Sequence, residues 1–264
     1  YNIRFFSKGG ENMRFYLEVE VEKNELPIEI RRVVLSMLKL SLNSAADGRF
    51  YNRYYDSNNP IKKDFTFSVY MKGAVFAKEK IELSSKTFKI YFSADDKNKT
   101  GLILMNSFLT KKNKRFPLEN NNSLKIKNVI QINQDLIFNS EITVRTFAGS
   151  SIVARDHNRE SNKDRYFTIE DKGYNEKLTD VIRVQARLAG FCEEDVLNIN
   201  IKAFEDCKKV LVRHYGSFID CTVGSFLISA NPDILQYLYD AGAGSRSSSG
   251  FGMLNLVSQS ANCE

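Results

Sequence analysis

The chain has 264 residues, of which 42% are apolar, and a formal net charge of +6. This length accommodates one large domain or two of about 100–150 residues, and the apolar content excludes wholesale disorder. The positive charge favours a polyanionic partner such as a nucleic acid, although a lysine-rich proteome alone would give the same balance.

Metal-binding and membrane proteins are further classes that the composition argues against. The chain has two histidines, and its four cysteines form no C-x-x-C pair, which is typical of reduced thiols in a cytoplasmic protein rather than of a zinc site. No apolar stretch approaches the ~20 residues of a membrane span. We therefore expect no metal, no cofactor and no membrane association. Residues 1–12, which precede Met13, are expected to be a leader or a remnant of the expression vector.

The first half of the chain predicts alternating strands and helices. Apolar and acidic residues alternate over 14–22, which is the period-two pattern of a half-buried strand. A helix is expected to begin near Pro27, and a polar loop rich in Tyr, Asn, Arg and Lys is expected over 47–64. The other predicted elements are strands over 65–76, 86–95 and 123–134 and a helix over 101–112. Their order is that of a ferredoxin-like domain.

The second half predicts a similar order. Strands are expected over 140–156 with a break at Gly149, and over 196–204, 208–230 and 252–257; helices are expected over 175–191 and 231–244. The last helix has Asn231 as a candidate N-cap and ends at Gly242. We therefore predict an α+β fold of two tandem ferredoxin-like (RRM-like) domains, residues 13–135 and 140–257.

The segment "AGAGSRSSSGFGMLNLV" over 241–257 is the most distinctive motif. Its glycines follow the pattern G-x-G-x-x-x-x-x-G-x-G, at Gly242, Gly244, Gly250 and Gly252. The loop follows a helix and precedes a strand, which is the reverse of a Rossmann loop, and it lacks the G-K-[ST] of a Walker loop. A flexible connection is the simplest interpretation, but the spacing, Arg246 within the loop and Phe251 between the last two glycines set it apart.

This loop resembles that of the RAMP superfamily of CRISPR-associated proteins, and within it the repeat-processing endoribonuclease family, the sixth Cas protein. The phrases "MRFYLEVEV", "DFTFSVYM" and "IVARDHNRESNKDRYFTIED" are similar to segments of the same family. The resemblance extends over about residues 13–257. It implies tandem ferredoxin-like RAMP domains that hold RNA between and across them.

The resemblance also implies an activity. Members of the family cleave precursor CRISPR RNA within the repeat without a metal ion, because the ribose 2′-OH attacks the adjacent phosphate and leaves 2′,3′-cyclic phosphate and 5′-OH ends. Such a reaction needs a base, an acid and a cation beside the phosphorane.

Only part of the family's catalytic pattern is present. Lys63, with Lys62 beside it, stands where the family has a lysine before the "FTFS"-like phrase, but Asn52 stands where a histidine is expected. Tyr51 and Tyr54 can donate or orient protons, stack on RNA or pack the loop. His157 lies among basic residues and can act as acid or base or contact RNA, whereas a structural role is expected for the second histidine.

The expected RNA contacts are basic side chains and glycine amides. The basic set is Lys62, Lys63, Arg155, Arg159, Lys163, Arg165 and Arg246. Gly242, Gly244, Gly250 and Gly252 are expected to let backbone N–H groups approach RNA phosphates without an intervening Cβ. Two other hypotheses are a non-catalytic RNA-binding RAMP subunit that assembles with other Cas proteins, and a two-domain scaffold without a nucleic acid. A homodimer is also left open.

Overall fold

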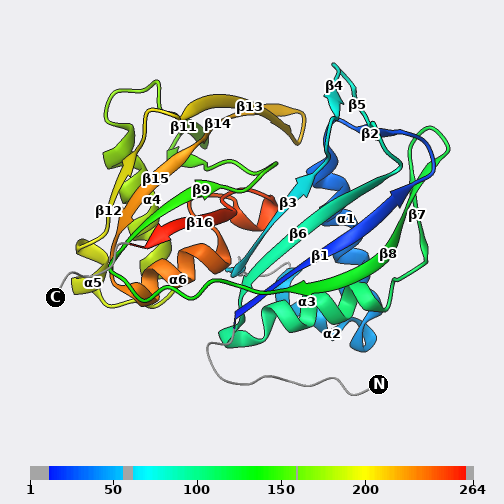
Figure 1. Cartoon of the computed structure of the whole chain (residues 1–264), viewed down its shortest axis with the longest axis horizontal. Coiled ribbons are helices and arrows are strands. Elements are labelled where there is room, and N and C mark those ends of the chain that lie inside the picture. Colours follow the sequence, from blue (N-terminus) through cyan, green and yellow to red (C-terminus); the bar gives the residue numbers. More distant parts are fainter. Residues whose placement is uncertain (1–11, 56–61, 159, 260–264) are drawn as a thin grey trace.

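The computed structural model describes residues 12–55, 62–158 and 160–259, which form two units side by side (Figure 1). The predicted leader lies outside the described residues except Asn12, where the first strand begins. The main elements of the first unit are β1 (Asn12–Val21), α1 (Ile30–Ser44), β3 (Phe65–Tyr70), β6 (Thr87–Asp95), α3 (Thr100–Leu109), β7 (Arg115–Leu118) and β8 (Asn122–Ile132). Its sheet has the order β3-β6-β1-β8-β7.

The second unit repeats this topology. Its main elements are β9 (Glu141–Thr146), α4 (Tyr174–Leu188), β12 (Asn200–Ala203), β15 (Ser225–Ser229), α6 (Pro232–Ala241) and β16 (Leu254–Gln259). Its sheet has the order β12-β15-β9-β16. In both units the strand–helix–strand–strand–helix–strand chain therefore builds a sheet whose fourth and third strands flank the first. The predicted α+β fold of two tandem ferredoxin-like units is confirmed.

Smaller elements decorate the two units. The first has a three-stranded sheet of β2 (Glu25–Pro27), β4 (Val75–Phe76) and β5 (Lys80–Glu82), and the second has the hairpins β10 (Ala154–Asn158)–β11 (Lys163–Phe167) and β13 (Lys208–His214)–β14 (Ser217–Val223). The short helices are η1 (Ala46–Gly48), α2 (Arg49–Tyr55), η2 (Asp96–Asn98), α5 (Glu193–Leu197) and η3 (Ser247–Ser249).

The sequence pattern explains the main elements and fails at two places. The alternation in β1 buries Phe15, Leu17 and Val19 completely. The predicted helix start at Pro27 is wrong, because this residue ends β2 and α1 begins at Ile30. The predicted loop over 47–64 contains η1 and α2, and residues 56–61 lie outside the described part of the chain. The strand predicted over 140–156 with a break at Gly149 is present as β9, which ends at Thr146, and as β10, which pairs with β11 in a separate sheet.

Helix α6 joins the two units. Asn231 accepts a hydrogen bond from the Asp233 amide at 3.0 Å and caps the helix, as the sequence predicts. Arg14 on β1 is only 4% exposed and crosses to this helix, where its Nη1 donates to the Tyr239 hydroxyl at 3.0 Å. Its Nη2 donates to the carbonyl oxygen of Leu254 at 3.1 Å. The guanidinium of Arg14, from the first unit, is therefore buried in the contact between the two units.

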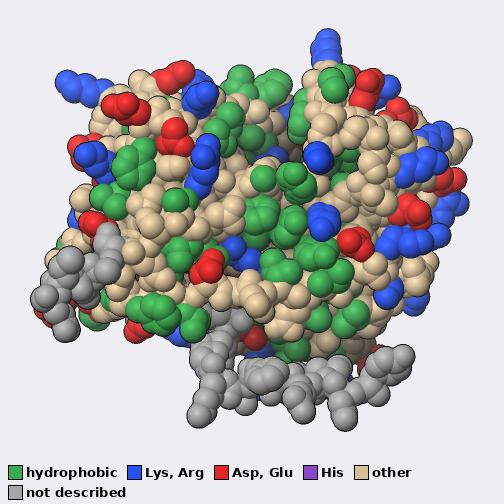
Figure 2. All heavy atoms as spheres, viewed as in Figure 1, with side chains coloured by type: hydrophobic (Ala, Val, Ile, Leu, Met, Phe, Trp, Pro, Cys, Tyr) green, Lys and Arg blue, Asp and Glu red, His purple; other side chains and the backbone are tan. Residues whose placement is uncertain are grey.

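The face drawn in Figure 2 has no concentrated basic patch over this contact. Hydrophobic side chains gather in the middle, where β3 and β6 meet the second unit, and Lys and Arg side chains concentrate toward the right edge. Among the described residues no helix is long and apolar enough to cross a membrane.

Candidate functional site

A hollow of about 480 Å³ between the two units gathers most of the predicted basic residues, and we call it the cleft. The segment before β3, the start of β10, one face of α4 and residues 244–248 of the glycine-rich loop form its walls. Its basic lining residues are Lys62, Lys63, Arg155, His157, Lys177 and Arg246. Because only Asp156 and Asp180 oppose them, the cleft carries excess positive charge and suits an anionic ligand.

The two lysines of the first unit differ in their surroundings. Lys62 pairs with Asp64 at 2.9 Å. Lys63 has no carboxylate partner in the described part of the chain, and its ammonium lies 4.8 Å from the centre of the Tyr55 ring. Burial, with the nearby charge of Lys39, lowers the pKa of Lys63. Lys63 is therefore the cation of this wall that remains available to a ligand.

A single carboxylate organises the opposite wall. Asp164 on β11 accepts hydrogen bonds from His157 Nδ1 at 2.8 Å, the Tyr166 hydroxyl at 3.1 Å, Arg155 Nη1 at 3.2 Å and Arg246 Nη2 at 2.9 Å. Burial raises the pKa of Asp164, but the hydrogen bonds from His157 and Tyr166 and the charge of Arg155 outweigh it and bring the pKa to about 2. We call Asp164 and these four partners the Asp164 cluster.

The Asp164 cluster fixes the chemistry of His157. An ionised carboxylate only accepts hydrogen bonds, so the neutral imidazole carries its proton on Nδ1 and keeps a basic Nε2. A carboxylate that orients a histidine in this way is the arrangement of many general bases. The side chain is 37% exposed and lines the cleft, so its free nitrogen can meet a bound molecule.

The structure brings together six of the predicted site residues and separates the others. Lys62, Lys63, Arg155, His157, Gly244 and Arg246 line the cleft. Lys163 and Arg165 pair with Asn158 and Asp156 in the β10–β11 ladder, on the face opposite His157. Arg159 lies outside the described residues.

The aromatic and amide candidates on α2 do not line the cleft. Tyr54 is 4% exposed and its hydroxyl donates to Thr100 Oγ1 at 3.2 Å, so the hypothesis that it acts on a substrate is wrong for this conformation. Tyr51 stacks on Tyr55 with ring centres 5.5 Å apart, and Asn52 is exposed on the helix. The helical backbone over 49–55, which the sequence reading missed, aims these side chains elsewhere.

The glycines of the loop pack closely against other parts of the protein. All four are buried and have φ between +76° and +92°; these are Gly242, Gly244, Gly250 and Gly252. A methyl group at Gly250 would lie 2.6 Å from the Phe67 ring, and one at Gly252 would overlap the carbonyl of Ala243. The amide of Gly252 donates to the Ser151 carbonyl at 2.8 Å. The close approach seen here is to the protein itself, and contacts of these glycines with RNA phosphates stay a prediction.

Residues that the sequence analysis missed complete the cleft. Lys177 on α4 lines it and pairs with Asp156 at 2.8 Å. Asp164 and Tyr166 form the support behind His157 and Arg246. The segment "NKDRYF" has no alternation that marks Asp164, and only the fold shows that this carboxylate faces three basic side chains.

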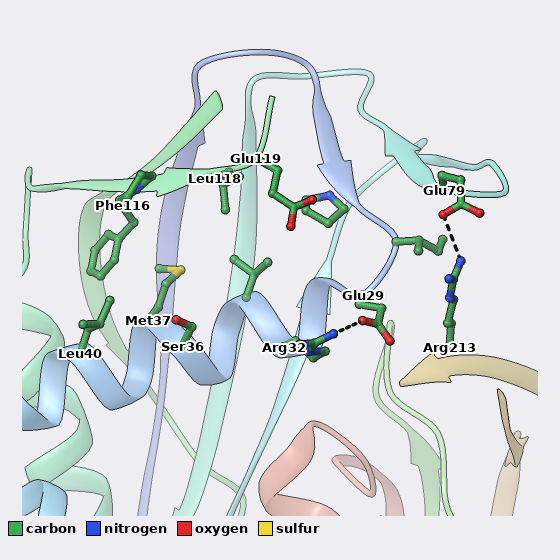
Figure 3. Close-up of a pocket in the computed structure, with 14 residues that line it drawn as sticks. Glu29, Arg32, Ser36, Met37, Leu40, Glu79, Phe116, Leu118, Glu119 and Arg213 are labelled. Carbon is green, nitrogen blue, oxygen red and sulfur yellow. Dashed lines mark hydrogen bonds and ion pairs between the residues drawn. The ribbon is translucent and has the colours of Figure 1, made fainter. Parts of the chain in front are cut away.

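A larger hollow of about 700 Å³ lies beside α1 and has a different character (Figure 3). In Figure 3 the side chains of Met37 and Leu40 on α1 point toward Phe116 and Leu118, and acidic residues lie around them. Its two arginines, Arg32 and Arg213, pair with Glu29 at 2.6 Å and Glu79 at 3.3 Å, and Glu119 adds a further carboxylate. Its three carboxylates outnumber its two arginines, so it does not suit a polyanion. Among the described residues no group of three His, Cys, Asp or Glu can hold a metal ion.

Solved structures with the same arrangement are CRISPR-associated proteins of the RAMP type. The protein of a Cas6-related gene from Pyrococcus furiosus has a TM-score of 0.76 and 16% identity, over 94% of this chain and 100% of that one. A RAMP protein that binds different RNA substrates has a TM-score of 0.74 and 19% identity over 93% and 100%. Thermus thermophilus Cas6 in a product complex has a TM-score of 0.65 and 13% identity over 93% and 100%. At these identities the likeness establishes the fold.

The second half of the chain also matches a protein family by its sequence. Residues 131–256 match the family described as CRISPR associated protein Cas6, C-terminal. The matched region includes the glycine-rich loop, and the resemblance inferred from the loop is confirmed. No curated protein matches the sequence.

Proposed function

We propose that the chain binds CRISPR repeat RNA in the cleft and cleaves it within the repeat without a metal ion. The observation that carries the proposal is that Lys62 and Lys63 of the first unit meet Arg155, His157 and Arg246 of the second around one hollow. Single-stranded RNA is bound by positively charged grooves of this kind, and the Cas6 match over the second half supports CRISPR RNA as the ligand.

The cleft contains groups suited to each step of the cleavage. His157 Nε2 takes the proton of the ribose 2′-OH, and the 2′-oxygen forms a bond to phosphorus while the bond from phosphorus to the 5′-oxygen breaks. The ammonium of Lys63 stabilises the charge on the phosphorane and gives a proton to the leaving 5′-oxygen, for which its lowered pKa is favourable. The products are a 2′,3′-cyclic phosphate and a 5′-OH, and no water is consumed.

A non-catalytic RNA-binding subunit is the second candidate function. Two observations favour it. Asn52 replaces the expected histidine, and His157 and Arg246 are already engaged with Asp164. In that case the cleft holds repeat RNA for other Cas proteins and no bond is broken.

Labelled repeat RNA from the CRISPR array of the same genome, incubated with the chain in EDTA, separates these functions. Cleavage with cyclic-phosphate ends supports the nuclease, and tight binding without cleavage supports the subunit. If the chain neither cleaves nor binds the RNA, both functions are contradicted. For a nuclease we expect His157→Ala to slow cleavage by about 10²–10⁴-fold. The matched control is Lys163→Ala, on the opposite face of the same hairpin, which should leave the rate unchanged.

A further inference from the structure

A second hollow of about 460 Å³ adjoins the cleft, and we call it the His214 hollow. Arg155, His157 and Arg246 line both hollows, so they form the boundary between them. The far wall of the His214 hollow is the β13–β14 hairpin, which contributes His214, Tyr215 and Phe218. An extended ligand that crosses the cleft past these three basic residues therefore reaches the His214 hollow next.

Buried polar atoms without partners face this hollow. His214 is 3% exposed, and neither of its ring nitrogens hydrogen-bonds to any residue that the structure describes. The Nε of Arg246 is also buried and lacks a partner within the same residues. Burying a polar group without a hydrogen bond costs about 1–3 kcal/mol, so two such groups at one place indicate a site for a ligand.

The packing of His214 makes a purely structural role a poor explanation. Its ring meets the edges of Tyr215, 4.5 Å between centres, and Phe251, 5.7 Å between centres. A phenylalanine would fill this aromatic setting without burying two nitrogens. Burial and the charges of Arg246 and Arg31 lower the pKa of His214 to about 4, so near neutral pH the ring offers one donor and one acceptor.

The other walls indicate the chemical class of the ligand. Tyr215 is 57% and Phe218 65% exposed, and Tyr166 adds a third ring. Arg155 and Arg246 outweigh the single carboxylate of Asp164. Aromatic rings stack on nucleobases, arginines bind phosphate, and a neutral imidazole can pair with the polar edge of a base.

We propose that the His214 hollow holds one unpaired nucleobase of the RNA in the cleft, with the edge of the base on His214 and its phosphate on Arg155 and Arg246. This inference rests on the proposed function of the cleft. In this proposal the Tyr215 ring, which packs against His214, turns aside so that the base can reach the ring nitrogens.

The chain's composition allows a direct test, because it has only two histidines. Nitrogen-15 spectra of the imidazoles would be recorded with a 2′-O-methyl RNA dodecamer containing all four bases, which cannot be cleaved, and with an abasic dodecamer of the same length. We expect the His214 signals to shift with the base-bearing RNA only, and the His157 signals to shift with both. His214→Phe assigns the signals.

Affinity measurements provide an independent readout. Phe218→Leu and His214→Phe should each weaken binding of the base-bearing RNA by about tenfold, with little effect on the abasic RNA. The matched control is Phe76→Leu, on β4 and 66% exposed, which should change neither affinity.

The outcomes separate the two proposals. If the His157 signals shift and the His214 signals do not move with either RNA, the base pocket is overturned and the RNA cleft stands. If the base-bearing RNA does not bind even at low salt, both are overturned. The spectra are recorded on the unaltered chain, so the result does not depend on whether a variant folds.

Discussion

The inner and outer sides of the loop over residues 242–252 differ in burial, partners and charge. The inner side is buried and neutral: Gly250 lies against Phe67, and Phe251 accepts a hydrogen bond from Thr66 Oγ1 at 2.6 Å. The outer side, over residues 244–248, lines the cleft and carries Arg246. The comparison teaches that Gly242 and Gly250 let the loop pack closely on the first unit, while the residues between them line the cleft.

Changing a glycine on the inner side should have the largest effect. Gly252→Ala forces a methyl group into the Ala243 carbonyl at a φ of +76°, so we expect a loss of roughly 3 kcal/mol or more in the free energy of unfolding, measured with urea. Gly190→Ala is the matched control, because it has a φ of +88° and no atom within 4 Å, and should cost roughly 1 kcal/mol. Equal losses would show that backbone conformation, and not close packing, decides the cost.

His214 connects the two sides, since it packs on Phe251 and Arg246 helps to lower its pKa. With a folded pKa of about 4 against 6.5 when unfolded, the unfolded chain binds the extra proton between these values, so the histidine costs stability as the pH falls from 6.5 to 4. We expect this contribution to be on the order of 3 kcal/mol at most. In His214→Phe the free energy of unfolding should therefore fall less over this interval. If the free energy of unfolding has the same pH dependence in the parent and the variant, this contribution of His214 is contradicted.

The hydrogen bond from Thr66 gives a smaller test of the inner side. Thr66→Val keeps the shape and leaves the buried Phe251 carbonyl without its donor, so we expect a loss of about 1–2 kcal/mol in thermal or urea unfolding. RNA affinity should stay within twofold of the parent. A marked loss of RNA affinity at unchanged stability would mean that the inner side also contacts the ligand. Thr143→Val on β9 controls for the change of residue type.

Arg246 on the outer side should give the smallest change in stability. Its ion pair with Asp164 is partly solvated, so Arg246→Ala should lower the free energy of unfolding by less than about 1 kcal/mol. If the guanidinium binds phosphate, the plot of log affinity against log salt becomes shallower by about one. Lys163→Ala should leave that slope unchanged. An unchanged slope for Arg246→Ala would remove the residue from the RNA contacts.

The fold was predictable because its information is local. Period-two and helical patterns repeat in both halves, and the ferredoxin-like order follows from them. The helix over 49–55 was missed because its Phe, Tyr and Asn residues have weak helix propensity, and it forms where Tyr54 packs into the core. The domain boundaries near 135 and 140 and the cytoplasmic location stay predictions.

The site was predictable only in part, because its contacts are long-range. The motif around Lys63 and the basic stretch around His157 were found, but the distance between the two walls is set by the fold. Asp164 was missed as an organising carboxylate, since one of its partners, Arg246, lies 82 positions away. The glycine pattern indicated a close approach and could not indicate that the partner is Phe67 of the other unit.

The guanidinium of Arg14 affects how the chain matures during translation. The first unit emerges from the ribosome early and contains one acceptor of this buried cation, Ser93, yet two others, Tyr239 and Leu254, lie 225 and 240 positions later. Until those residues are made, water must solvate Arg14 at the edge of β1. The nascent first unit therefore leaves the ribosome with an incomplete surface, which the last helix and strand of the second unit cover.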